Sequence, residues 1–311
     1  MMKNTAGCRR AAGYRPENAK GSRPVKRFAA LLFALAVLAA CTAGEKKNPE
    51  TGKAEAAEPA AESGTPAGTG MPAESALPAR VFEAPASIPA EIIAGINRSK
   101  PDFLADLHTL LASEQEDLFR LVDKSHSLPA DFVPPGLVSL TDTVAEGRSY
   151  RINRADLSLR RAAEQALEEM SAAARADGVT VLVSSTYRSY EYQDGLYKRN
   201  VAQLGQEAAD RESARPGTSQ HQFGTAVDFG SITDDFAQTE AGIWLARHAG
   251  DFGWSLSYPD GYEDVTGYRW ECWHYRYLGV PAVQMQQKWF GGIQQYMLEF
   301  IHAWKEFQGL P

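Results

Sequence analysis

The chain has 311 residues, of which 44% are hydrophobic, and a formal net charge of −7. Residues 1–40 hold eight Lys or Arg and one Asp or Glu, a net of +7, so residues 41–311 carry −14. Nucleic-acid-binding proteins rely on clustered positive charge to contact phosphates. The acidic remainder of this chain has no basic cluster and no phosphate-loop motif, so we expect no nucleic-acid partner.

The N-terminal segment has the pattern of a secretory signal. A basic region precedes the apolar run Phe28–Ala40, which is shorter than the ~20 residues that a membrane-spanning helix needs. The run ends in Leu38-Ala39-Ala40-Cys41, which resembles the lipobox of bacterial lipoproteins; an ordinary signal peptide with an incidental cysteine is the alternative. We therefore expect a lipoprotein signal at residues 1–40, a lipid on Cys41, and an exported, membrane-anchored protein that faces the cell wall or periplasm.

Residues 41–87 are predicted to be a disordered tether. They are mostly Ala, Pro, Glu, Gly, Thr and Ser, and cannot bury enough apolar surface to offset their conformational entropy. Such a stretch has an r.m.s. span of about 35–40 Å. Cys8 would leave with the signal and Cys41 would carry the lipid, so Cys272 would have no partner for an intrachain disulfide.

Residues 88–311 are predicted to form one folded domain, which we expect to be monomeric. Apolar residues at helical spacing, first Phe103 to Leu111 and then Leu118 to Val122, predict a helical N-terminal part over residues 88–125. The same reasoning predicts helices at 155–176, 190–204, 240–249 and 282–307, and short strands at 179–183, 225–229, 254–257 and 271–277. Short strands with segregated helices favour an α+β fold, in which helices flank a small antiparallel sheet.

Two motifs contain the residues of an open zinc site. The first, Ser219–Asp228, contains His221 and Asp228, and the second, Trp270–His274, ends in His274. Catalytic zinc sites use three protein ligands of this kind and leave a fourth position for water. Gly224 and the small residues after it allow a tight turn, so one segment can return a second ligand to the metal. The two motifs together therefore predict a zinc site made by these three side chains.

Other polar residues near the motifs suit the chemistry of such a site. Zinc lowers the pKa of bound water toward ~7, and a base must then lie within hydrogen-bond reach of that water. Glu271, three residues before a ligand, is the best candidate. Arg188 is the candidate for stabilising the charge that builds on a carbonyl oxygen during amide hydrolysis. Ser219 and Gln193 are candidate hydrogen-bonding groups for the substrate.

Each of these residues also has an ordinary structural interpretation. A single histidine is more often structural than catalytic, and we interpret His108, His126, His248 and His302 in that way. The aromatic residues around the second motif are interpreted as core or cleft wall: Trp270, Trp273, Tyr275 and Tyr277. Cys272 is interpreted as a buried thiol on a strand. Only the occurrence of both complete motifs, with an arginine upstream, makes the structural interpretation improbable for the metal site.

The motifs Ser-x-His-x-x-Gly-x-Ala-x-Asp and Glu-x-Trp-His resemble those of the LAS zinc peptidases. Within that group the chain is similar to D-alanyl-D-alanine carboxypeptidases of the VanY type, over about residues 118–280. Further stretches carry the resemblance: Leu121–Lys124, Leu128-Pro129, Ser184–Ser189, Pro216–Ser219 and Trp273–Gly279. One departure is Cys272, where proline is common in the family.

The resemblance implies a role for each candidate residue. It implies Zn²⁺ on His221, Asp228 and His274, with Glu271 as the general base and Arg188 at the oxyanion. It also implies that Gln193 and Ser219 lie in the substrate pocket. The implied substrate is the D-amino-acid end of peptidoglycan stem peptides.

Four functions remain open at this point. The leading one is a lipid-anchored zinc D,D-carboxypeptidase that removes the terminal D-Ala of the stem peptide. A close variant is an L,D-carboxypeptidase that acts on tetrapeptides. A third is a peptidoglycan-binding module without turnover, although the base and all ligands are present. A fourth is an endopeptidase that cuts cross-bridges, which fits a lipoprotein signal poorly.

Overall fold

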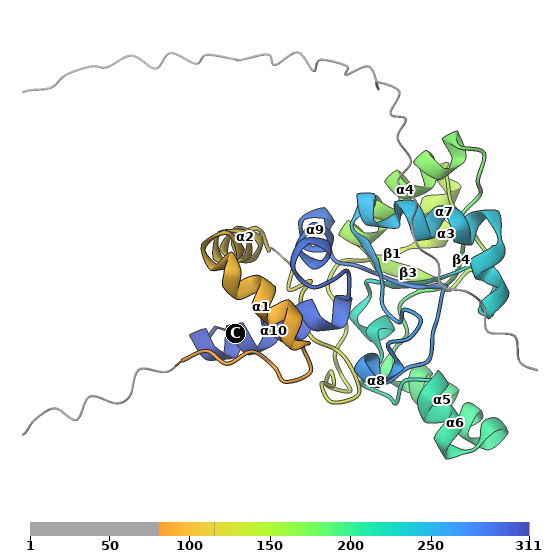
Figure 1. Cartoon of the computed structure of the whole chain (residues 1–311). Coiled ribbons are helices and arrows are strands. Elements are labelled where there is room, and N and C mark those ends of the chain that lie inside the picture. Colours follow the sequence, from red (N-terminus) through yellow and green to blue (C-terminus); the bar gives the residue numbers. More distant parts are fainter. Residues whose placement is uncertain (1–80, 115, 311) are drawn as a thin grey trace, which may run out of the picture. The chain divides into compact units, whose positions relative to one another are not determined.

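The computed structural model describes residues 81–114 and 116–310 (Figure 1). The predicted signal, the lipidated Cys41 and most of the predicted tether lie outside these residues. Phe82, which the sequence assigned to the tether, packs edge-on against Phe300 and Trp304, with ring centroids 5.1 and 5.0 Å apart. Within the described ranges, no helix is both long and apolar enough to span a bilayer.

One hydrophobic core is built from helices at the two ends of the described chain. The N-terminal helices α1 (Ala90–Arg98) and α2 (Lys100–Ser113) pack with the C-terminal helices α9 (Val280–Trp289) and α10 (Gln294–Gln308). Helix α2 buries Phe103, Leu107 and Leu110, the apolar stripe that the sequence indicated. We refer to these four helices and the side chains between them as the helical core (Figure 1).

The prediction of a helix through residue 125 is wrong beyond Ser113. Leu121 and Val122 are buried as expected of apolar residues, but their segment is not helical. The carbonyls of Leu118 and Arg120 accept hydrogen bonds from Arg276 Nη2 at 3.0 and 2.8 Å. Because Arg276 of the distant strand β7 donates hydrogen bonds to these two carbonyls, the carbonyls do not need helical partners.

A second core lies between a five-stranded sheet and helix α4 (Arg161–Ala176). The strand order is β2, β4, β5, β7, β6, and all pairs are antiparallel except β2 with β4. The strands have these bounds: β2 Arg151–Ile152, β4 Leu182–Ser185, β5 Ala226–Phe229, β6 Trp254–Leu256 and β7 His274–Tyr277. A separate two-stranded sheet pairs β1 (Leu137–Ser139) with β3 (Ser158–Arg160). The predicted α+β fold with a small sheet is confirmed.

Strand β5 separates this core from the polar face of the sheet. Val227 and Phe229 point into the core with Met170 and Leu167 of α4. Successive side chains of a strand point to opposite faces, so Asp228 lies on the other face.

Further elements complete the domain: α3 Leu140–Ala145, α5 Tyr190–Leu204, α6 Gln206–Glu212, η1 Gln220–Phe223, η2 Asp234–Gln238, α7 Glu240–His248, η3 Ala249–Phe252 and α8 Glu263–Thr266.

Several predicted boundaries moved for identifiable reasons. Helix α5 has the predicted bounds, but α4 begins at Arg161 because the preceding residues pair as β3. The predicted helix 282–307 is two helices, since Gly291 and Gly292 adopt positive φ of 62° and 79° between them. Strand β7 begins at His274 rather than at residue 271, because His274 N–H donates to the Glu271 carbonyl and closes a turn. Glu271 and Cys272 therefore lie in a turn and not on a strand.

Candidate active site

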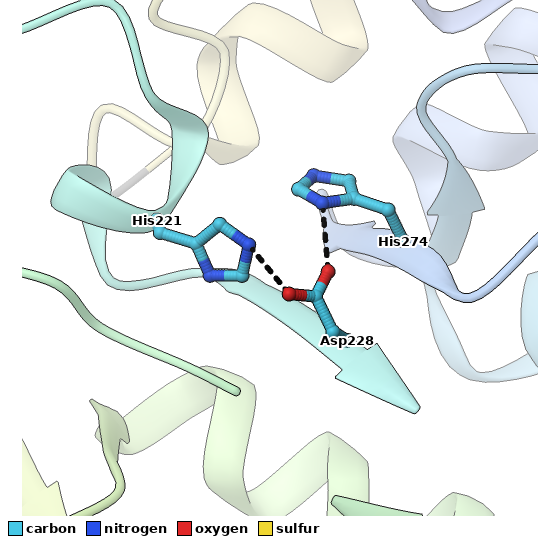
Figure 2. A group of neighbouring side chains, drawn as sticks. All are labelled: His221, Asp228 and His274. Atoms are coloured by element: carbon cyan, nitrogen blue, oxygen red, sulfur yellow. Dashed lines mark hydrogen bonds and ion pairs between the residues drawn. The ribbon is translucent and has the colours of Figure 1, made fainter. Parts of the chain in front are cut away.

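The structure brings His221, Asp228 and His274 together on the polar face of the sheet (Figure 2). Asp228 and His274 are direct partners in the β5–β7 register. His221 lies on the η1 turn, which ends at Gly224 with a φ of +77°; a Cβ there would lie 2.9 Å from Pro134. Asp228 lies between the two imidazoles, 3.2 Å from His221 Nε2 and 3.0 Å from His274 Nδ1. All three side chains are buried.

Hydrogen bonds on the outer side of each imidazole set its tautomer. His221 Nδ1 lies 2.7 Å from the Thr186 carbonyl, and His274 Nε2 lies 3.1 Å from Gln220 Oε1. Both oxygens accept, so these nitrogens carry the hydrogens. His221 Nε2 and His274 Nδ1 are then left with lone pairs directed at the carboxylate.

This arrangement suits a cation. Burial and the nearby Arg188 charge lower the pKa of His221 to about 4, so its imidazole is neutral at pH 7. Burial opposes ionisation of Asp228, but its pKa lies well below the ordinary aspartate value, and the Arg188 guanidinium 2.7 Å away favours the charged form. Two lone pairs and a carboxylate would repel one another across these short distances. A metal ion removes that repulsion, and the three ligand atoms lie within 4.8 Å of one another, close enough to share one ion.

Glu271 lies beside this group but is not one of the three ligands. Its Oε2 is 3.8 Å from His274 Nδ1, and its backbone N–H donates to the Tyr258 carbonyl at 3.0 Å. Burial, together with the charge of Asp228, raises the pKa of Glu271 to about 8. A carboxylate whose proton affinity is raised in this way is suited to accept and return a proton near neutral pH.

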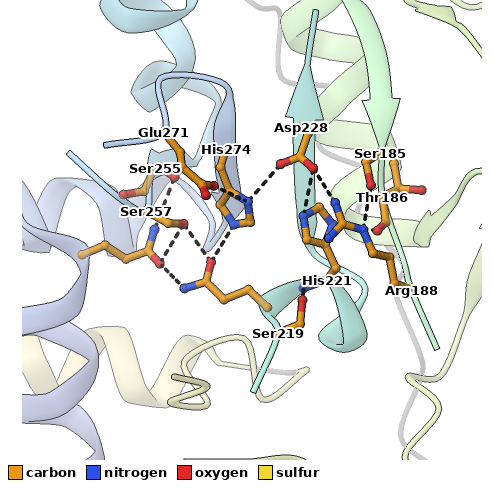
Figure 3. A network of polar contacts seen from close by, with 12 residues as sticks. Ser185, Thr186, Arg188, Ser219, His221, Asp228, Ser255, Ser257, Glu271 and His274 are labelled. Atoms are coloured by element: carbon orange, nitrogen blue, oxygen red, sulfur yellow. Dashed lines mark hydrogen bonds and ion pairs between the residues drawn. The ribbon is translucent and has the colours of Figure 1, made fainter. Parts of the chain in front are cut away.

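Arg188 follows strand β4 and reaches the same carboxylate (Figure 3). Its Nη2 lies 2.7 Å from Asp228 Oδ2, and its Nε donates to Ser185 Oγ at 2.9 Å. Gln193 supports it, since Gln193 Oε1 lies 3.3 Å from Arg188 Nη1. Gln193 is fully buried, its Nε2 donates to the Ala214 carbonyl, and it does not line the cleft. In this structure it contacts the cleft lining through Arg188 and the backbone of Ala214.

Ser219 and Cys272 occupy different surroundings. Ser219 lines the cleft, and its Oγ accepts from the His221 N–H at 3.3 Å as the N-cap of η1. Cys272 is buried, and its Sγ lies 3.7 Å from the carbonyls of Thr233 and Asp234. Burial raises the pKa of this thiol, which lowers the fraction present as the reactive thiolate. Among the described residues, His221, Asp228 and His274 are the one group able to hold a metal ion.

The three metal-site residues, Glu271, Arg188 and Ser219 all line one cleft of about 250 Å³. Trp273, interpreted from the sequence as core or cleft wall, is part of its lining. Sequence reasoning missed other lining residues, which include Asn200, Glu212, Tyr258, Tyr268 and Arg269. These come from separate loops and helices and belong to neither motif, so no local pattern could have identified them.

The comparisons with known proteins agree with this geometry. The family model described as VanY, D-alanyl-D-alanine carboxypeptidase, matches residues 156–280, which include every candidate site residue named above. Residues 156–280 of this chain therefore form a domain of the VanY family of peptidases.

Its similarity to individual proteins covers only part of each chain. The chain is 33% identical to the putative carboxypeptidase YodJ of Bacillus subtilis, over 55% of this chain and 64% of that protein. It is 38% identical to a D-alanyl-D-alanine carboxypeptidase of Enterococcus faecalis, over 37% of this chain and 47% of the relative. The chain therefore spans about half to two thirds of these relatives. Its structure is similar to that of the LdcB LD-carboxypeptidase, with a TM-score of 0.53 and 29% identity, over 60% of this chain and 87% of that one.

Proposed function

We propose that the protein is a zinc-dependent carboxypeptidase that hydrolyses the terminal D-Ala amide bond of peptidoglycan stem peptides. The observation that carries the proposal is the convergence of two imidazole lone pairs and a carboxylate beside Glu271 and Arg188 in one cleft. His221, Asp228 and His274 would hold the zinc ion. When bound, zinc supplies a water of lowered pKa and polarises the carbonyl of the scissile bond.

The remaining steps fall to the protein's own side chains. Glu271 accepts the proton of the attacking water and returns it to the nitrogen of the departing D-Ala, whose bond to the carbonyl carbon breaks. Arg188 stabilises the negative charge that develops on the carbonyl oxygen, and Gln193 and Ser185 hold its guanidinium in place. Ser219 lies in the cleft wall, where its hydroxyl would bind the substrate's terminal carboxylate or amide.

The choice between D,D and L,D bonds is a separate question. The family model and the Enterococcus faecalis relative favour the D,D bond, which we propose as the main activity. The structural likeness to the LdcB LD-carboxypeptidase supports L,D cleavage of tetrapeptides as a second candidate.

Purified protein loaded with zinc, incubated separately with pentapeptide and tetrapeptide muropeptides, tests both candidates by D-Ala release. We expect a higher kcat/KM on the pentapeptide. A higher value on the tetrapeptide would assign the L,D activity, and release from neither substrate would reject a carboxypeptidase. The Glu271→Ala variant is the control that separates turnover from binding alone.

We also propose that residues 1–40 are a lipoprotein signal, that Cys41 carries the lipid, and that residues 41–87 tether a monomeric enzyme to the membrane. The apolar run and the lipobox-like Leu38–Cys41 support this proposal. Incorporation of a labelled fatty acid that is lost in Cys41→Ala would test it. Labelling that persists in this variant would contradict it.

A further inference from the structure

A buried chain of polar side chains connects the proposed metal site to the C-terminal helix α10. Figure 3 labels three of the residues along it, His274, Ser257 and Ser255. Gln220, the residue before ligand His221, accepts at its Oε1 from His274 Nε2 at 3.1 Å and from Ser257 Oγ at 2.8 Å. Its Nε2 donates to Gln294 Oε1 at 3.3 Å. Gln294, at the start of α10, donates from its own Nε2 to the Ser255 carbonyl at 3.3 Å. The members are almost completely buried: Gln220 and Ser257 are 3% exposed and Gln294 is 1% exposed.

The orientation of both glutamine amides is determined at the Ser255 end of this series of hydrogen bonds. The Ser255 carbonyl can only accept, so Gln294 must present its nitrogen there and its oxygen to Gln220. Gln220 must then offer its own nitrogen to Gln294, which directs its oxygen toward His274. An oxygen in that position requires a hydrogen on His274 Nε2. The Nδ1 lone pair is consequently free on the side of Asp228.

We propose that Gln220 and Gln294 are positioning residues that hold His274 in its metal-binding tautomer. The inference rests on the proposed zinc site. The other imidazole, His221, is held in its metal-binding tautomer by a direct contact, because its Nδ1 donates to the Thr186 carbonyl. The tautomer of His274 is instead set through two glutamines. Helix α10 therefore takes part in the site, although it lies outside the family-matched residues 156–280.

The proposal predicts graded effects on zinc affinity. Gln220→Met removes the acceptor of His274, and loss of such an outer contact weakens metal binding by about 10–100-fold. Gln294→Met leaves Gln220 in place but lets its amide turn over, so we expect a smaller weakening, of about tenfold or less. A turned amide would present its nitrogen to His274 and favour a hydrogen on Nδ1, where zinc must bind.

Gln295→Met is the matched control for this test. Gln295 is the next residue of the same helix, is only 6% exposed, and its amide nitrogen donates to Asp123 and Glu299. No hydrogen bond joins it to Gln220 or His274 among the described residues. Its replacement changes the packing of α10 in the same way without touching the chain of polar groups, so its zinc affinity should stay within about twofold of wild type.

The experiment is zinc titration of the full-length wild type and the three variants against a competing chelator. Zinc affinity should fall in the order wild type, Gln295→Met, Gln294→Met and Gln220→Met. If Gln220→Met fails to fold, the comparison of Gln294→Met with Gln295→Met still tests the proposal. Equal zinc affinities of Gln294→Met and Gln295→Met would overturn it.

The zinc titration does not depend on turnover. A protein whose zinc affinity falls in Gln294→Met, but which releases no D-Ala in wild type, would contradict the proposed function and leave the positioning role intact. The reverse outcome, with D-Ala release in wild type and unchanged zinc affinity in Gln294→Met, would contradict only the positioning role.

Discussion

The core between the five-stranded sheet and helix α4, here called the sheet core, differs from the helical core in what it contributes to the site. The sheet core orients β5 and β7, so that Asp228 and His274 project from the opposite face toward His221. The helical core contributes none of the metal-site residues, and it contacts the site through Gln294. Catalysis should therefore depend sharply on the sheet's polar face, whereas the helical core should affect mainly stability. The predictions that follow test this division.

Removal of the metal should have the largest effect. We expect a strong chelator to abolish D-Ala release and zinc to restore it, because the proposed mechanism takes its activated water from zinc bound at these three residues. Zinc should also raise the Tm, since a ligand that binds only the folded state stabilises it. Full activity in a protein shown to be free of metal would contradict the proposed chemistry.

Replacement of the base should come next. Glu271→Gln keeps the shape of the side chain but cannot accept a proton, so kcat should fall about 10²–10⁴-fold. Zinc affinity should change little, because Glu271 is not among the three ligands. Glu212→Gln is a matched control, since Glu212 also lines the cleft but lies outside both motifs.

The same residue should set the acidic limb of the pH profile. Glu271 works only when it is deprotonated, so activity should be low below its pKa and rise as the pH increases through it. Burial raises this pKa to about 8 without a metal, and a nearby cation favours the charged form, so the limb should lie below pH 8. A profile of kcat/KM against pH measures it, and a limb unchanged in the residual activity of Glu271→Gln would assign it to another group.

Arg188→Lys should have an intermediate effect. Lysine keeps the charge but cannot contact Asp228, Ser185 and Gln193 at once, as the guanidinium does. We expect kcat to fall about 10²–10³-fold, the range for loss of one group that stabilises the oxyanion. Steady-state kinetics would measure this loss, and a change confined to KM would instead indicate a role in substrate binding.

A change in the helical core should have the smallest effect on catalysis. Phe103 is 1% exposed and packs edge-on against Trp289 and Phe300. Phe103→Ala should lower the free energy of unfolding by about 3–5 kcal/mol, measured by urea denaturation. Its kcat in the folded state should remain near the wild-type value. A large fall in kcat would show that the two cores are coupled more strongly than the contacts indicate.

The sequence indicated much of the site because the metal-binding chemistry lies in local patterns. The three proposed ligands and Glu271 come from two short motifs, and the structure brings them together as the motifs implied. Strand β5 and helix α5 were also predictable, since their apolar spacing and the glycines near them are local signals. The role of Gln193 was less predictable, because nothing local shows that its amide contacts Arg188 rather than the cleft.

Tertiary structure decided what depends on distant partners. The segment around Leu118 to Val122 has helical spacing, yet Arg276 of β7 binds its carbonyls and holds it out of a helix. Tyr258, Tyr268 and Arg269 line the cleft from the connection between β6 and β7, which includes α8. Gln294 stands 74 residues from Gln220, and no pattern within α10 indicates that its amide is linked to a metal ligand. The sequence by itself thus determined which groups could bind a metal, and only the packing of distant segments decided which side chains orient those groups and shape the cleft around them.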